Sequence, residues 1–222
     1  MPRPPRRPGQ DSSKPRHAPR GPADDEAASA PRIGGGELRR RRLAHQPDGR
    51  TRPMKDRVRE SLFDLLGTDV RRALAIDLFA GTGALGFEAI SRGASRAIFV
   101  ERHFPTADVL RKSARDLDVV DRCDIRSGDV LLWSRRMPEL PTDMPWITFV
   151  SPPWSFFGEG HERREELLAL IEMMCRVAPP GSTVVVEADT LFDPAALPDA
   201  ESWERRPMPP AVLLFHRKSL TS

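Results

Sequence analysis

The sequence predicts an α/β fold in which a mostly parallel sheet of seven strands carries helices on both faces. Short apolar runs rich in valine, isoleucine and phenylalanine alternate along the chain with segments whose apolar residues recur at helical spacing. This alternation is typical of parallel strands that are joined by crossover helices. The last two strands are joined by residues 207–210, which are too few for a crossover, so we expect the final strand to be antiparallel.

The predicted elements follow one another from residue 54 onward. We expect helices over residues 54–66, 84–92, 105–117 and 162–177, because their apolar residues share one face and glycine or proline follows most of them. We expect strands over residues 73–79, 96–100, 124–126, 146–150, 183–187 and 212–216, with a weaker strand near Trp203.

Two further segments precede this main domain, which we assign to residues 54–222. Residues 1–30 are mostly Pro, Arg, Gly, Ser, Asp and Ala, so they have too little to bury and we expect a disordered tail. This tail is either inert or an arginine-bearing arm for an anionic partner. Residues 31–53 combine a run of three glycines with alternating apolar and basic residues, which predicts a small basic hairpin extension.

The loop after the first strand is the first candidate ligand site. Its sequence, Asp77-Leu78-Phe79-Ala80-Gly81-Thr82-Gly83, lies outside the carboxyl end of a strand, where open α/β sheets bind ligands. The spacing of Gly81, Gly83 and Gly86 also fits a nicotinamide dinucleotide. The Asp77 carboxylate argues against that ligand, because it would repel a pyrophosphate and can instead bind a cationic group, such as the amino-acid part of S-adenosylmethionine.

Acidic residues also follow the second and third strands. Glu101 can bind both hydroxyls of a ribose, and Asp129 can accept from an adenine amino group while the Val130 N–H faces the ring. Any one of these acids alone could be a solvated loop residue. Three of them at successive strand ends favour a binding site for S-adenosylmethionine. The predicted cofactor-binding residues are Asp77, Phe79, Ala80, Gly81, Gly83, Glu101, Asp129 and Val130.

The residues after the strand at 146–150 predict a site for an amino group. Neither Pro152 nor Pro153 has a backbone N–H, so the strand ends there and leaves carbonyl oxygens that we expect no helix or sheet to use. Those carbonyls and the Ser151 hydroxyl can accept from an exocyclic amine, and the Trp154 ring can stack on the base. We therefore predict Ser151, Pro152, Pro153 and Trp154 as the catalytic residues.

Positive charge is concentrated before the main domain. The whole chain has a net charge of +3, whereas residues 32–59 hold ten basic and three acidic residues, so the remainder is net acidic. A solvated basic face is the ordinary explanation of such a run, but its place beside a base-shaped pocket favours phosphate contacts. The residues predicted to bind the phosphates of a nucleic acid, which the family resemblance described below implies to be RNA, are Arg32, Arg39, Arg40, Arg41, Arg42, Arg52, Arg57 and Arg59.

Together these motifs resemble the class I S-adenosylmethionine-dependent methyltransferases that modify exocyclic amines. More narrowly, the chain from residue 31 onward resembles the bacterial 16S ribosomal RNA (guanine(966)-N(2))-methyltransferase family. The resemblance rests on Arg32-Ile33-Gly34-Gly35, on Arg40 to Leu43, on Arg52 to Phe63, on Leu78 to Gly86 and on Ser151 to Trp154. It implies a Rossmann-like methyltransferase fold, S-adenosyl-L-methionine as cofactor, and methyl transfer to guanine N2 in 16S ribosomal RNA of the small subunit or its assembly intermediate.

The chain departs from the pattern of this family at four positions. The family has aspartate where this chain has Ser151, and usually tyrosine or phenylalanine where it has Trp154; Met54 and Ser113 replace a usual threonine and asparagine. Tryptophan keeps a stacking face. Serine still accepts a hydrogen bond but cannot hold a departing proton, so the effect on rate ranges from slight to about 10²–10⁴-fold.

Three other functions stay open: methylation of another nucleic-acid amine such as adenine N6, a weakly active or non-catalytic ribosome-binding role, and a nicotinamide oxidoreductase. Cys123 and Cys175 match no metal or redox spacing, so we expect reduced thiols and no metal. No apolar run is long enough to span a membrane. The expectation is therefore a cytoplasmic, monomeric enzyme that acts on RNA.

Overall fold

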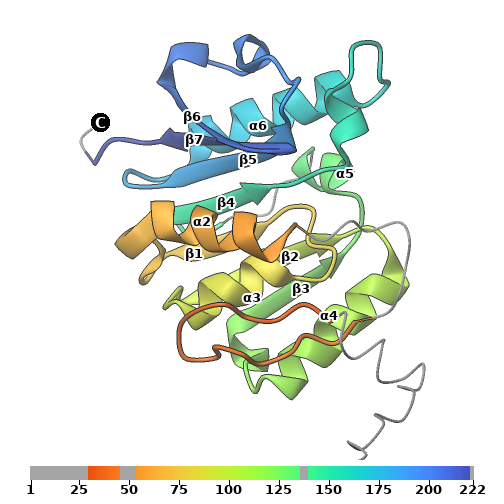
Figure 1. Ribbon diagram of the computed structural model, residues 1–222, viewed down its shortest axis with the longest axis vertical. Helices are drawn as coiled ribbons and strands as arrows, with labels where there is room; N and C mark the ends of the chain where they lie inside the picture. The colour runs from red at the N-terminus through yellow and green to blue at the C-terminus, as the bar shows by residue number, and fades with distance from the viewer. Residues whose placement is uncertain (1–29, 46–53, 136–139, 221–222) are drawn as a thin grey trace, which may run out of the picture.

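The computed structural model describes residues 30–45, 54–135 and 140–220 of the 222-residue chain (Figure 1). The predicted tail therefore lies outside the described residues, except for Ala30, and so does Arg52. The rest of the predicted basic extension and most of the main domain are described.

A seven-stranded sheet runs through the centre of the molecule. In spatial order its strands are β3 (Cys123–Ser127), β2 (Arg96–Glu101), β1 (Leu74–Asp77), β4 (Trp146–Val150), β5 (Thr183–Asp189), β7 (Ala211–Arg217) and β6 (Trp203–Met208). The pairs among β3, β2, β1, β4 and β5 are all parallel, whereas β7 pairs antiparallel with both β5 and β6. The predicted fold class and its antiparallel last strand are confirmed.

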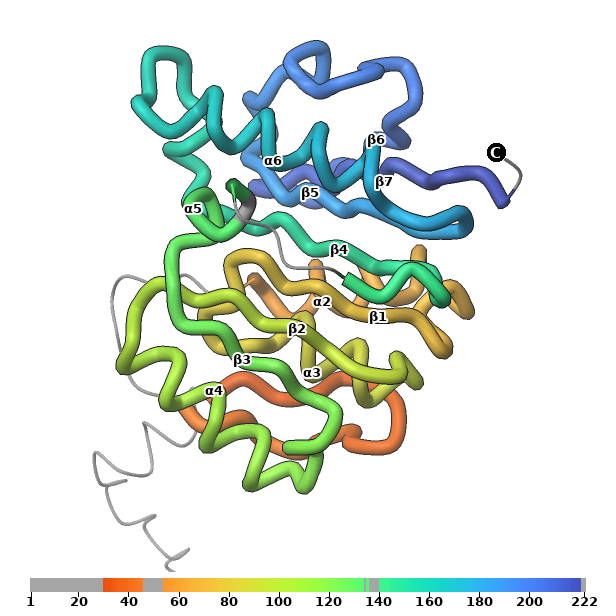
Figure 2. The backbone as a smooth tube through the Cα atoms, turned by 180° about the vertical axis from the view of Figure 1, so that it is seen from behind, coloured from red at the N-terminus to blue at the C-terminus, as the bar shows by residue number. Residues whose placement is uncertain are grey.

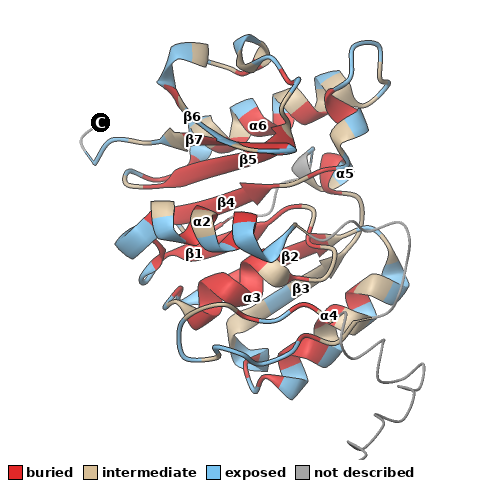
Figure 3. Ribbon diagram, in the orientation of Figure 1, coloured by how far each residue is buried: buried red, intermediate tan, exposed pale blue. Residues whose placement is uncertain are grey.

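Helices cover both faces of this sheet, because successive strand residues point to opposite sides. On one face, α2 (Asp56–Leu66), α3 (Ala84–Ser91) and α4 (Phe104–Asp116) pack on strand residues such as Ala75 and Phe99 (Figure 1). On the other, α5 (Val130–Ser134) and α6 (Arg164–Val177) pack on residues such as Ile76 and Ile98 (Figure 2). Most of the sheet is buried between the two hydrophobic cores, as its red colour in Figure 3 shows.

Several boundaries differ from the sequence prediction for physical reasons. Strand β1 ends at Asp77 rather than residue 79, because the chain then turns into the glycine loop. Strand β5 runs two residues past Glu187, since β7 pairs with it as far as Asp189. Strand β6 passes through Pro207, which an edge strand tolerates because one side of it needs no ladder hydrogen bond.

The described part of the basic extension, residues 30–45, reverses direction and lies along α3 and α4 (Figures 1 and 2). One isolated antiparallel bridge joins Arg32 and Arg42, so within the described residues the predicted hairpin is reduced to a single pair. The Ile33 N–H also donates to the Arg41 carbonyl at 3.0 Å, and the extension bonds to the helices as well. The Glu37 N–H donates to the Ser91 carbonyl at 2.8 Å, and the Ala44 N–H donates to the Ser113 hydroxyl at 2.9 Å.

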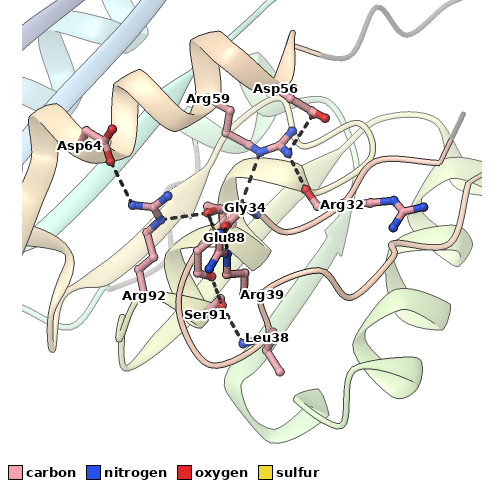
Figure 4. A network of polar contacts seen from close by, with 12 residues as sticks. Arg32, Gly34, Leu38, Arg39, Asp56, Arg59, Asp64, Glu88, Ser91 and Arg92 are labelled. Carbon is pink, nitrogen blue, oxygen red and sulfur yellow. Dashed lines mark hydrogen bonds and ion pairs between the residues drawn. The ribbon is translucent and has the colours of Figure 1, made fainter.

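A buried carboxylate, Glu88 of α3, holds this extension to the main domain (Figure 4). It accepts hydrogen bonds from the N–H groups of Gly34 (2.7 Å) and Gly35 (2.8 Å). It also pairs with two guanidiniums, Arg92 at 2.9 Å and Arg59 at 3.5 Å. Two backbone N–H groups and two guanidiniums therefore surround a side chain that is 1% exposed.

The prediction that Arg59 contacts phosphate is wrong. Its side chain is 2% exposed, and it pairs with Asp56 (2.9 Å) and donates to the Arg32 carbonyl (2.5 Å) (Figure 4). The cause is its place on the helix, since Arg59 precedes the buried Leu62 and Phe63 by three and four residues. Its charge fixes the extension instead of facing solvent.

Removing the Glu88 carboxylate is expected to destabilise the protein. The Glu88→Ala variant leaves the buried Arg59 without its buried carboxylate partner, which costs about 3–5 kcal/mol in comparable buried pairs. Urea unfolding measures the loss. The control is Asp64→Ala, which removes an exposed partner of Arg92 and should cost less than about 1 kcal/mol. Equal losses in the two variants would contradict this account of Glu88.

Candidate active site

The parallel strand register brings three polar side chains to the carboxyl edge of the sheet. Asp77, the last residue of β1, is opposite Phe149 of β4, so Ser151 follows only two residues farther along. Val150 of β4 is opposite Val186 of β5, which places Ser151 beside Glu187. The site therefore lies where β1, β4 and β5 end, as in other open α/β sheets.

The glycine loop after β1 is fixed to the end of β2. The Gly81 N–H donates to one oxygen of Glu101 at 2.8 Å, and the His103 N–H donates to the other at 2.7 Å. Gly83 has a φ of 76°, and a Cβ at this position would lie 2.5 Å from a methyl carbon of Leu110. The loop thus needs glycine at this turn, and Glu101 orders the loop while keeping lone pairs for a ligand.

Asp77 is buried beneath this loop with one oxygen unsatisfied. One carboxylate oxygen accepts the Gly86 N–H at 3.2 Å, whereas the other has no hydrogen-bond partner among the described residues. Burial raises the pKa of Asp77 to about 7; the Gly86 hydrogen bond acts against this rise, and the nearby Glu101 charge adds to it. A buried acceptor without a donor suits a cationic ligand, which is the group that the sequence predicted here.

Both carboxylate oxygens of Asp129 already accept hydrogen bonds within the protein, which the sequence did not indicate. One oxygen caps α5 by accepting the Leu131 N–H at 3.0 Å, and the other accepts from Arg163 at 2.7 Å. Burial alone would raise its pKa, but the hydrogen bonds from Arg163 and Leu131 outweigh burial and lower the pKa. Any adenine contact made by Asp129 must therefore share these oxygens with Arg163, while the neighbouring Val130 is buried in the core.

Aromatic rings flank this part of the site. The ring of Phe156 lies edge-on to Phe79 at 6.4 Å and stacks on His161 at 4.9 Å. The Arg163 guanidinium lies 5.6 Å from the centre of the Phe156 ring. Arg163 and Phe156 were not foreseen, because Arg163 meets Asp129 across 34 residues of sequence and no local pattern indicates that pairing.

The Ser151-to-Trp154 segment takes the predicted course with one difference. Strand β4 ends at Val150, and a short 3₁₀ turn, η3 (Trp154–Phe157), begins with the partly exposed Trp154. The Pro153 carbonyl, however, accepts the Phe156 N–H at 2.9 Å within that turn, so the prediction that it is unused is wrong. Pro152 is buried, and its carbonyl receives no hydrogen bond from the described residues.

The partly exposed Ser151 hydroxyl donates to the carboxylate of Glu187. Glu187 is 8% exposed, and burial raises its pKa while the bond from Ser151 partly lowers it. Sequence reasoning missed Glu187 as a functional residue. The signal was present, since Glu187 ended a predicted buried strand as Asp77 and Glu101 do.

The remaining predicted RNA-binding arginines are exposed: Arg32, Arg39, Arg40, Arg41, Arg42 and Arg57. Some of these guanidiniums also bond to the protein itself, such as Arg39 to the Gly34 carbonyl at 3.2 Å and Arg41 to the Asp116 carbonyl. Five of the six lie on the extension along α3 and α4. This segment of the described chain therefore carries a concentration of exposed positive charge, which we call the basic surface of the extension.

The cysteines and the other possible metal ligands do not form a second site in the described residues. Both cysteines are free and partly buried, and burial raises the pKa of each thiol to about 12. Within residues 30–45, 54–135 and 140–220, no cluster of His, Cys, Asp or Glu has the arrangement of a metal site. No helix in the same ranges is long and apolar enough to cross a bilayer.

Comparison with known proteins identifies the family. The model of the family described as Conserved hypothetical protein 95 matches residues 31–206, which is most of the chain. The chain belongs to this family. Its matched region contains the basic extension, the glycine loop and the Ser151-to-Trp154 segment.

Named relatives and solved structures add to this assignment. Ribosomal RNA small subunit methyltransferase D of Escherichia coli is 35% identical over 123 residues, which cover 55% of this chain and 60% of that protein. The chain thus spans less than two thirds of that relative. The solved structure of the Escherichia coli protein yhhF has a TM-score of 0.67 and 25% identity, covering 87% of this chain and all of that one.

A solved complex of a more distant protein agrees in fold. The 16S rRNA N2 G1207 methyltransferase RsmC of Thermus thermophilus, in complex with AdoMet and guanosine, has a TM-score of 0.60 and 20% identity. The match covers 78% of this chain and 44% of that one. It supports the class I methyltransferase topology of the sheet.

The raised pKa of Asp77 should make the free energy of unfolding depend on pH. Between the unfolded pKa of 3.8 and the folded pKa of about 7 the folded state binds the extra proton. The stabilisation is therefore complete below the unfolded pKa and is lost as the pH rises through 7, at a rate of at most about 1.4 kcal/mol per pH unit. We expect Asp77→Asn to remove this loss between pH 5 and pH 8.

Urea unfolding of both proteins from pH 4 to pH 8 measures the difference. The wild-type free energy of unfolding should fall more steeply than that of Asp77→Asn, and the two curves should converge near pH 4. Parallel curves would contradict the raised pKa.

Proposed function

We propose that this protein transfers the methyl group of S-adenosylmethionine to the exocyclic N2 amine of a guanine in 16S ribosomal RNA. The observation that carries this proposal is the edge shared by β1 and β4, where an amine-accepting segment lies beside a buried carboxylate, Asp77, one of whose oxygens has no donor among the described residues. The names of the relatives and the resemblance of the sequence motifs support the same reaction.

The residues around the glycine loop fit the cofactor. The unsatisfied Asp77 oxygen suits the cationic amino-acid part, and the remaining lone pairs of Glu101 suit the ribose hydroxyls. Phe79, Gly81 and Val130 line the same strand ends. When bound, S-adenosylmethionine supplies an electrophilic methyl group, and the protein residues position the acceptor amine against it.

The Ser151-to-Trp154 segment would hold the target base. The lone pair of the guanine amine is delocalised into its ring, so acceptors must draw the N–H bonds out of the ring plane. The Ser151 oxygen and the unbonded Pro152 carbonyl can provide two such acceptors. Stacking on Trp154 adds about 1–3 kcal/mol and requires a base that is unstacked from its helix, as in other base-modifying enzymes.

The basic surface on the extension would bind the RNA backbone. Its exposed arginines provide sequence-independent attraction to phosphates, while the pocket selects the base. We propose the small ribosomal subunit or its assembly intermediate as the partner of a monomeric, cytoplasmic enzyme that needs no metal. Methylation of adenine N6 is the second candidate, because a Pro-Pro-aromatic pocket can accept either amine.

The direct test of the proposed function is to map the methylated atom. Small subunits that lack the modification are incubated with the protein and S-adenosylmethionine labelled on its methyl group. We expect label in N2-methylguanine at one nucleotide of 16S RNA, and little label with Asp77→Asn at low cofactor concentration. Label in N6-methyladenine would replace the substrate assignment, and no label would contradict the proposal.

The phosphate-binding role of the extension predicts a change in salt dependence. Replacing Arg32 and Arg40 with alanine should weaken RNA binding and lower the slope of log Kd against log salt by about 2, one unit for each lost phosphate contact. Fluorescence anisotropy of a labelled RNA measures this slope. The control is Arg205→Ala, an exposed arginine on the edge strand β6. Equal slopes in the double variant and the control would exclude the extension from the RNA interface.

A further inference from the structure

Ser151 and Glu187 are hydrogen-bonded at the edge of the sheet, with Ser151 nearer the surface and Glu187 buried behind it. They come from neighbouring parallel strands, and the register places them side by side. The hydroxyl of Ser151 is partly exposed, whereas Glu187 is 8% exposed. A ligand that approaches this edge therefore meets the hydroxyl first, with the carboxylate bonded behind it.

The electrostatic surroundings of Glu187 are unusual for a buried acid. Within the described part of the chain its carboxylate has one hydrogen-bond partner, Ser151, and no cation within ion-pair distance. A buried carboxylate without a cation lowers stability, and native proteins usually pair it. Glu88 shows the contrast, because two backbone N–H groups and two guanidiniums surround it.

We propose that Glu187 is a positioning residue that acts through Ser151 to make its hydroxyl a strong acceptor for the target amine. This inference rests on the proposed function, in which Ser151 holds the amine. The family has an aspartate where this chain has Ser151. In this chain a negative charge is still present, on Glu187 of the neighbouring strand. The Ser151 hydroxyl donates to Glu187 and so keeps its lone pairs directed toward the edge of the sheet.

The step balances as a methyl transfer followed by loss of one proton. The N2–carbon bond forms as the carbon–sulfur bond of the sulfonium donor breaks, and the bonding electrons stay on sulfur. The methylated nitrogen then carries a positive charge and releases a proton to the Ser151 oxygen. The hydroxyl proton of Ser151 moves at the same time to the Glu187 carboxylate, which leaves neutral N2-methylguanine, a neutral serine and a protonated glutamate.

Two physical properties suit Glu187 to this task. The bond from the Ser151 hydroxyl to the Glu187 carboxylate is charge-assisted, and it polarises the serine oxygen into a stronger acceptor for the amine. Burial also raises the pKa of Glu187, so its carboxylate holds a proton more readily than an exposed glutamate. Serine alone has neither property.

The kinetic test uses variants that keep the shape of the pair. Glu187→Gln removes the charge and should lower kcat for guanine N2 methylation by about 10²-fold. The Kd values for RNA and S-adenosylmethionine should change less than about twofold, because Glu187 lies behind Ser151. Glu204→Gln, on strand β6 beyond β7, is the matched control and should keep the wild-type rate.

A rescue variant distinguishes this role from a structural one. In the double variant Ser151→Asp with Glu187→Gln, the carboxylate moves to the front position and most of the lost rate should return. Ser151→Asp alone places two carboxylates together and should not exceed the wild-type rate. A merely structural hydrogen bond predicts no rescue, since the double variant restores charge and not the original contact.

A measurement without turnover tests the contact itself. In protein labelled with ¹³C at glutamate carboxyl groups, the pKa of Glu187 should shift upward in Ser151→Ala, because the hydrogen bond that lowers it is lost. The Glu187→Gln variant assigns the resonance. An unchanged pKa of Glu187 in Ser151→Ala would contradict the pairing.

The outcomes separate this inference from the proposed function. If the wild-type protein transfers no methyl group to guanine N2, the proposed function fails whatever the variants do. If the wild-type protein is active and Glu187→Gln keeps more than about half of its rate, the role of Glu187 is overturned while the function stands. Loss of rate without rescue by Ser151→Asp also overturns it.

Discussion

The parallel pairing of β1 with β4 and of β4 with β5 determines where Asp77, Ser151 and Glu187 lie in the active site. Asp77 ends β1, and the register carries Ser151 and Glu187 to the same edge. A shift of one residue along β4 would turn Ser151 away from Glu187, because strand side chains alternate between faces. The two hydrophobic cores fix this register, since each strand places alternate residues into one core or the other.

Buried carboxylates divide into two kinds in this structure. Two backbone N–H groups and two guanidiniums surround Glu88, which joins the basic extension to α3. Asp77 keeps an oxygen without a donor, and Glu187 has a hydroxyl as its partner in the described residues. The satisfied acid stabilises the fold, whereas the two incompletely satisfied acids lie at the ligand-binding edge. Burying these two carboxylates without enough donors lowers the stability of the free protein, and a bound ligand that supplies donors would offset this cost.

Local patterns were sufficient to predict the fold and part of the site. Apolar runs located five of the seven strands, the other two were expected from weaker signals near residues 124–126 and Trp203, and the rule that ligands bind at strand ends selected Asp77, Glu101 and Ser151. The same rule would have selected Glu187, but its pairing with Ser151 depends on which strands are neighbours. Helical spacing likewise contained the evidence that Arg59 faces inward, although its place in an arginine-rich run suggested exposure. The Asp129–Arg163 pair needed the tertiary structure.

The most direct test of this account is a crystal structure with S-adenosylhomocysteine and guanosine bound. The account predicts that guanine N2 lies within hydrogen-bond distance, about 2.6–3.2 Å, of the Ser151 oxygen, with Glu187 still bonded to that hydroxyl. The cofactor's amino-acid part should lie on Asp77. A guanine held with N2 away from Ser151, or a cofactor that leaves the Asp77 carboxylate unpaired, would contradict the account.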